Sequence, residues 1–220
     1  MRALRLALIA GALVVGVANA SPTAPRDGAE FSTLATPQPT QVVGKKVEVI
    51  EFFAYHCGAC NAFEPTLNNW VKKQGDKILL RRIPMPFQGP LDPEARLFLT
   101  LEAMGKLDAY HARVFHAVHV ERKRLMTDAA IIAWAGANGL DKAQFAAAWH
   151  SFGVQTKLKR LVQVAEAYKA NRTPTVVIDG KYVVSPAQVQ DANRIQDAGQ
   201  VMTATGQVMD ALVLKAAVSK

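Results

Sequence analysis

The strongest constraint on the fold of this chain is a pair of cysteines between a strand-like and a helix-like segment. Cys57 and Cys60 are the two cysteines among 220 residues, and the apolar, β-prone run 47–53 precedes them. Apolar residues at helical spacing begin near Asn61, directly after the pair. Free N–H groups and the positive dipole end at a helix start stabilise a thiolate. The pair therefore predicts an α/β arrangement that supports thiol-disulfide exchange.

The spacing of apolar residues changes along the chain and predicts a mixed α/β fold. Strands are expected at 30–34, 47–53, 78–83, 175–178 and 181–184, the last two forming a hairpin at Asp179-Gly180. Helices are expected at 61–75, 92–105, 127–139, 141–149, 154–169 and 203–217. A block of helices thus interrupts a set of strands.

The first twenty residues have the pattern of a secretory signal peptide. Two arginines precede an apolar core, and the small residues 18–20 are typical of a cleavage site. The core is shorter than the roughly 20 residues that span a bilayer, and no later segment is expected to span one. We therefore expect residues 1–20 to be a signal peptide and 21–29 a leader. The exported chain then meets an oxidising compartment, the periplasm of a bacterium.

The charge and size of the chain exclude some other classes of protein. Without the expected signal peptide, 24 Lys and Arg stand against 18 Asp and Glu, a net charge of +6. A moderate basic balance without a nucleic-acid-binding motif, on an exported chain, argues against nucleic acid as a partner. Two cysteines are too few to staple a fold, so a hydrophobic core must stabilise it.

Several motifs resemble the DsbA family of periplasmic thiol-disulfide oxidoreductases. They are Glu51-Phe52-Phe53 before the cysteines, the helical block, Ala148-Trp149-His150-Ser151-Phe152, and Thr173-Pro174 ahead of Asp179-Gly180-Lys181-Tyr182. The resemblance covers nearly all of the chain after the leader. It implies a thioredoxin fold with an inserted all-helical domain. Residues 30–88 and 170–220 would form the thioredoxin-like domain, and 89–169 the insertion.

The resemblance also implies a function. Members of the family donate a disulfide to newly exported proteins, use no metal or organic cofactor, and are reoxidised by the membrane protein DsbB. We therefore expect this chain to donate its Cys57–Cys60 disulfide to exported protein thiols, as a monomer, with a DsbB-like membrane partner. A disulfide isomerase or reductase of the same fold is the nearest alternative.

The two cysteines are expected to have different roles. Cys57 lies nearer the helix start and is the expected nucleophile, whereas Cys60, one turn into the helix, is the resolving thiol. A low pKa at Cys57 stabilises the reduced protein and makes the disulfide a better oxidant. The intervening Gly58-Ala59 replaces the Pro-His best known in the family, so a weaker oxidant is expected. A protonated His56 would compensate; an alternative is that it faces solvent without effect.

Three further residues are candidates for supporting the site. Glu51 lies inside an apolar strand, where a buried carboxyl titrates upward, and the resemblance suggests Lys72 or Lys73 as its partner. Thr173-Pro174 resembles the cis-proline segment of thioredoxin-like proteins, where a substrate strand pairs with the residue before the proline. A threonine there is more frequent in isomerase-type relatives.

Other residues are candidates for binding a metal ion or a substrate. A CxxC pair can bind a soft metal such as Cu(I), but no methionine or histidine cluster surrounds this one apart from His56. Three histidines, His111, His116 and His119, share one helical stretch but not one face, which does not favour a metal site. Met85 and Phe87 are candidates for an apolar substrate groove.

Overall fold

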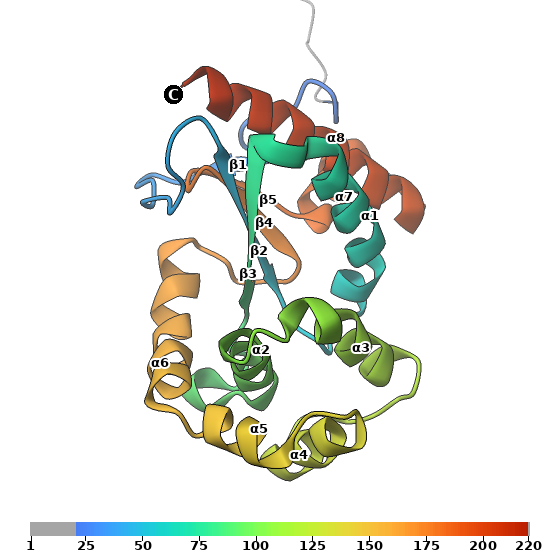
Figure 1. Ribbon diagram of the computed structural model, residues 1–220. Coiled ribbons are helices and arrows are strands. Elements are labelled where there is room, and N and C mark those ends of the chain that lie inside the picture. Colours follow the sequence, from blue (N-terminus) through green and yellow to red (C-terminus); the bar gives the residue numbers. More distant parts are fainter. Residues whose placement is uncertain (1–20, 220) are drawn as a thin grey trace, which may run out of the picture.

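The computed structural model describes residues 21–219 and places a five-stranded sheet among helices (Figure 1). The strands are β1 (Ser32–Thr33), β2 (Val47–Phe53), β3 (Ile78–Pro84), β4 (Thr175–Ile178) and β5 (Tyr182–Val184). Their order in the sheet is β1-β5-β4-β2-β3, with β2 and β3 parallel and the other neighbours antiparallel. The sequence predicts β2 and β4 with these bounds, whereas the predicted first strand shrinks to two residues. The expected signal peptide lies outside the described residues.

Strand β2 is buried on both faces, as its apolar sequence predicts. Val47 and Val49 join one apolar core with Phe63 and Leu67 of helix α1 (Gly58–Gln74). Alternate residues of β2 point to the other face, where Ile50 and Phe52 join a second core shared with the helical block. Because β2 is central and leads directly to the cysteines, both cores fix the position of the site.

The helical block lies between β3 and β4 in the sequence and forms one end of the molecule (Figure 1). It consists of α2 (Pro93–Ala103), α3 (Leu107–His119), α4 (Asp128–Ala137), α5 (Lys142–Trp149) and α6 (Phe152–Ala167). The predicted caps form: Thr127 accepts a hydrogen bond from the Ala130 N–H, and Asp141 accepts one from the Gln144 N–H. Helix α6 begins two residues earlier than predicted, with Ser151 as its N-cap.

Two helices follow the hairpin. Helix α7 (Pro186–Asn193) was not predicted from the sequence, although Ser185 caps it and Pro186 occupies its first turn. Helix α8 (Ala198–Val218) begins five residues before the predicted start, because Asp197 caps it by accepting a hydrogen bond from the Gln200 N–H.

Helix α8 also corrects the expectation that no segment after the signal peptide is suited to a membrane. By length and composition alone, this helix could cross a membrane. Most of its large apolar residues, among them Val208, Met209 and Leu212, are buried in the core shared with α1 and the sheet, whereas Leu214 and Val218 are exposed. The apolar character of α8 is therefore explained by its packing in this fold.

Candidate active site

Cys57 is the N-cap of α1, so the helix starts earlier than the predicted Asn61 and includes the dipeptide Gly58-Ala59. The Cys60 N–H donates to the Cys57 sulfur at 3.2 Å. Hydrogen bonds with the Cys60 thiol, with the Thr173 side chain and with the N–H groups of Cys60 and Ala59 lower the pKa of Cys57 to about 6, against the opposing effect of burial. The half-buried Cys57 therefore ionises at neutral pH.

Cys60 is fully buried on the inner face of α1 and is a free thiol, like Cys57. Burial raises the pKa of the Cys60 thiol far above its ordinary value, and the hydrogen bond to Cys57 and the charge of that neighbour act in the same direction. The pair is thus strongly asymmetric: one sulfur is stabilised as an anion at the helix start, and the other retains its proton.

The segment before β4 lies against the nucleophile. The Thr173–Pro174 peptide bond is cis, as the thioredoxin-like context predicts. The Cys57 sulfur lies 3.4 Å from the Thr173 carbonyl oxygen, to which it donates when it is protonated. Residues separated by 116 positions in the sequence therefore meet at the reactive sulfur.

Glu51 is buried, but its partner differs from the one expected. Arg82 of β3, not Lys72 or Lys73, donates to the Glu51 carboxyl group at 3.0 Å. The parallel register pairs Glu51 with Arg82 directly across β2 and β3, whereas Lys73 pairs with Asp210 of α8. Burial raises the pKa of Glu51 to about 8, although Arg82 opposes that shift.

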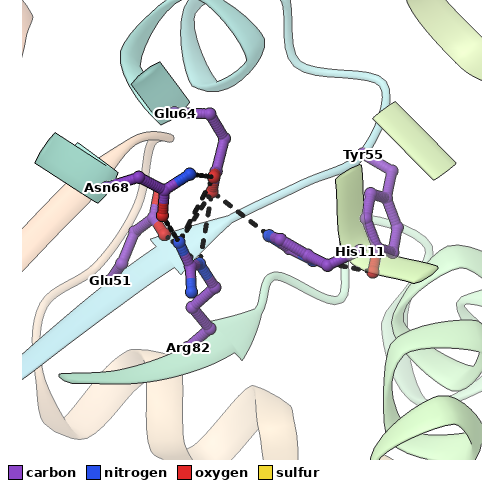
Figure 2. A network of polar contacts seen from close by, with 6 residues as sticks. All are labelled: Glu51, Tyr55, Glu64, Asn68, Arg82 and His111. Carbon is purple, nitrogen blue, oxygen red and sulfur yellow. Dashed lines mark hydrogen bonds and ion pairs between the residues drawn. The ribbon is translucent and has the colours of Figure 1, made fainter. Parts of the chain in front are cut away.

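Arg82 also links Glu51 to a second carboxyl group, as Figure 2 shows. Its guanidinium donates to Glu64 of α1 and to the Asn68 side-chain oxygen. Burial opposes ionisation of Glu64, but the hydrogen bond with His111 and the charge of Arg82 outweigh it and lower the pKa of Glu64. One arginine thus faces two carboxyl groups of opposite character, Glu51 largely protonated at neutral pH and Glu64 ionised.

His111 of α3 extends this network into the helical block. Its Nε2 lies 3.1 Å from Glu64 and its Nδ1 3.0 Å from the Tyr55 hydroxyl (Figure 2). Burial lowers the pKa of His111, although Glu64 opposes that shift. A neutral imidazole that donates to Glu64 and accepts from Tyr55 satisfies both contacts.

His56 is exposed to solvent but has a partner in the helical block. Glu94, in the first turn of α2, lies 2.6 Å from the His56 Nδ1 and also accepts the His56 backbone N–H at 3.2 Å. The hydrogen bond to Glu94 raises the pKa of His56, partly opposed by burial. The imidazole also contacts the ring of Phe87 edge-on at 5.5 Å.

The other sequence candidates occupy separate positions. His116 pairs with Glu121, while His119 donates to the Tyr55 carbonyl oxygen at 2.7 Å, so the histidines of α3 bind different partners. Phe87 is about half exposed next to His56, but Met85 is buried in the core.

Four residues of the site, Arg82, Glu64, His111 and Glu94, were not predicted from the sequence. Glu64 lies seven residues after Cys57, two helical turns along α1, so helical periodicity carried a signal for it. Arg82 can be identified only from the register of β2 and β3, and Glu94 and His111 only from the tertiary fold.

The role of Arg82 in stabilising this network is testable by substitution. Arg82→Met is expected to lower the free energy of unfolding by about 2 kcal/mol at pH 7, because Glu64 loses its charged partner. The stabilisation depends on ionised Glu64, whose pKa is lowered in the folded state. It is therefore present above the ordinary pKa of a glutamate and lost as the pH falls through the folded value. Urea unfolding at pH 7 and at low pH measures the difference.

Arg82→Lys is the matched control, and it should retain much of the stability at pH 7 because it keeps the charge. If Arg82→Met lowered the free energy of unfolding equally at both pH values, Arg82 would stabilise the fold through packing and not through its charge.

Comparisons with known proteins agree with this geometry. The family model for a DSBA-like thioredoxin domain matches residues 91–198. The thiol:disulfide interchange protein DsbA of Burkholderia cepacia is 37% identical over 195 residues, which cover 89% of this chain and 91% of that protein. DsbA of Bordetella parapertussis is also 37% identical, with 81% of this chain and 85% of that protein covered.

A solved structure extends the similarity to three dimensions. The crystal structure of Pseudomonas aeruginosa DsbA aligns with a TM-score of 0.75 at 32% identity, covering 88% of this chain and 96% of that one. The CxxC pair at the start of α1, the cis-proline segment and the helices inserted between β3 and β4 lie within this thioredoxin-like fold. This chain belongs to the DsbA family of thiol:disulfide interchange proteins.

Proposed function

We propose that this protein oxidises pairs of thiols in exported polypeptides by donating its Cys57–Cys60 disulfide. The observation that carries the proposal is the asymmetry between the two sulfurs: the pKa of Cys57 is about 6 at the helix start, and the pKa of the buried Cys60 is raised. An anionic Cys57 stabilises the reduced protein, so electrons flow from substrate to this protein.

The proposed reaction has two exchange steps. A substrate thiolate attacks the Cys57 sulfur, the bond between the two cysteines breaks, and its electron pair goes to Cys60, which takes up a proton. A second substrate thiolate then attacks the substrate sulfur of the mixed disulfide, and Cys57 leaves as a thiolate. The substrate gains a disulfide and the protein is left reduced.

Glu51 is the proposed source of the proton for Cys60. Burial keeps Glu51 largely protonated below pH 8, and electrostatic interactions couple it to both cysteines.

Glu51→Gln is expected to slow disulfide donation at least tenfold at pH 7, since general acids contribute factors of roughly 10² or more. The difference between parent and variant should shrink above pH 8, where Glu51 loses its proton in the parent. Stopped-flow fluorescence with a reduced dithiol peptide measures the rate. A constant ratio of the two rates across pH 6 to 9 would argue against Glu51 as the acid.

The surroundings of the reaction are part of the same proposal. Thr173, partly exposed next to Cys57, supports backbone pairing with an extended substrate.

DsbA proteins are periplasmic, and the predicted signal peptide supports that location. We assign reoxidation to a DsbB-like membrane protein, and divide the chain into a thioredoxin-like part, 30–88 and 170–220, and a helical insertion, 89–169. The chain is proposed to work as a monomer.

The experiment that tests this function is the equilibrium of the Cys57/Cys60 couple against glutathione, together with oxidation of a reduced dithiol peptide. An oxidising couple that forms the peptide disulfide stoichiometrically supports the proposal. A couple as reducing as thioredoxin would assign the protein to reductases. Metal bound in stoichiometric amounts after purification would favour the soft-metal alternative.

A further inference from the structure

The pair formed by His56 and Glu94 lies directly before the nucleophile but comes from two different parts of the fold. His56 follows β2, whereas Glu94 belongs to α2 of the helical block. A single oxygen of Glu94 contacts both the imidazole Nδ1, at 2.6 Å, and the backbone N–H of His56, at 3.2 Å. Two contacts to one residue fix the imidazole and the main chain that leads into Cys57.

The environment of Glu94 favours a charged partner. Its side chain is 5% exposed, and its second carboxylate oxygen is buried with no hydrogen-bond partner in the part of the chain that is described. A buried carboxylate without a counter-ion is costly, so a protonated imidazole is the form of His56 that this geometry stabilises. The imidazole is 41% exposed and can exchange its proton with solvent.

The charge of His56 acts on Cys57. The Cys57 thiolate is among the groups that raise the pKa of His56, after the hydrogen bond and charge of Glu94 and the charge of Asp92. An electrostatic interaction between two sites is reciprocal, so a protonated imidazole also favours the Cys57 thiolate, although less than the hydrogen bonds to its sulfur do. Two other side chains lie near His56. The ring of Phe87 packs edge-on against the imidazole, and His119 donates to the carbonyl oxygen of Tyr55, the residue before His56.

The residues between the cysteines offer no such charge. Gly58 and Ala59 have no ionisable side chain, and Ala59 contributes a backbone N–H to the Cys57 sulfur. We propose that Glu94 is a positioning residue for the redox reaction: it keeps His56 protonated and oriented beside Cys57, so that α2 supplies the cation that the dipeptide lacks. The consequence for oxidising strength rests on the proposed function.

The test is the titration of the Cys57 thiolate in the reduced protein, followed by its ultraviolet absorbance. His56→Gln and Glu94→Gln are each expected to lower the thiolate fraction at pH 6 about threefold, equivalent to a pKa rise of roughly half a unit to one unit. In the His56→Gln background, Glu94→Gln should cause no further loss. In the oxidised protein, the imidazole of His56 should titrate at lower pH in Glu94→Gln, as read by NMR.

The sign of the Glu94→Gln effect separates this proposal from a simple charge effect. If Glu94 were only a negative charge near Cys57, its removal would increase the thiolate fraction, and that result would overturn the proposal. An unchanged titration in His56→Gln, which alters a side chain that is 41% exposed, would also overturn it.

Glu102→Gln is the matched control, because Glu102 lies in the same helix and pairs on the surface with Lys157. It should leave the Cys57 titration unchanged. These titrations do not depend on substrate oxidation. The role of Glu94 can therefore be refuted while disulfide donation is confirmed, and disulfide donation can be refuted while the role of Glu94 is confirmed.

Discussion

Serine at position 57 is expected to abolish disulfide donation, whereas serine at position 60 is expected to leave a reactive Cys57 that forms stable mixed disulfides. In Cys60→Ser, a side-chain hydroxyl and the same backbone N–H remain near the Cys57 sulfur, so the hydrogen bonds that residue 60 makes to the thiolate have counterparts. Cys60 alone, in Cys57→Ser, stays buried and protonated at neutral pH.

Alkylation by iodoacetamide at pH 7 measures this contrast. The single cysteine of Cys60→Ser should react at least roughly 100-fold faster than that of Cys57→Ser, because the thiolate is the reacting species and only Cys57 is partly exposed. Mass spectrometry after incubation with oxidised glutathione should find a mixed disulfide on Cys57 alone. Comparable reactivity of both variants would contradict the assignment of nucleophile and resolving thiol.

The largest expected effect on stability comes from Phe53, at the end of β2. Its fully buried ring packs against Tyr55, Phe98, His111 and Phe115 at centroid distances of 5.1 to 5.9 Å. Phe53 therefore joins the strand that leads to the cysteines with helices of the inserted block. Phe53→Ala is expected to lower the free energy of unfolding by about 3–5 kcal/mol through the cavity it leaves.

Phe152→Ala provides the control for this prediction, since Phe152 is 87% exposed at the start of α6. That variant should change the free energy of unfolding by less than about 0.5 kcal/mol in the same urea titration. Equal losses of unfolding free energy in both variants would contradict the proposal that packing of Phe53 joins β2 to the inserted helices.

Local patterns in the sequence predict much of this fold. The apolar run of β2, the caps Thr127 and Asp141, and the Asp179-Gly180 turn each specify structure over a few residues, and each forms as predicted. The missed helix α7 had a local signal too, because Ser185 accepts a hydrogen bond from the Gln188 N–H. Short-range hydrogen bonds and periodicity are visible in a sequence because the interacting residues are close along the chain.

The charges around the cysteines depend on contacts between distant segments. The sequence indicates that Glu51 is a buried carboxyl, but its partner follows from the register between β2 and β3, which places Arg82 directly beside it. Glu94 and His111 reach the site from α2 and α3, and no spacing in the sequence relates them to Cys57. Side-chain networks of this kind are set by tertiary packing, so the sequence indicates the reacting atoms better than the groups that tune them.

Disulfide donation by this protein depends on the stabilisation of Cys57 as a thiolate at the start of α1, which the titration of this thiol measures directly. The ultraviolet absorbance of the thiolate in the reduced protein, measured from pH 3 to 10 with Cys57→Ser as the blank, should show a transition at a pKa of about 6. A single transition at a pKa near 8.5, the ordinary value of a free cysteine, would contradict that stabilisation.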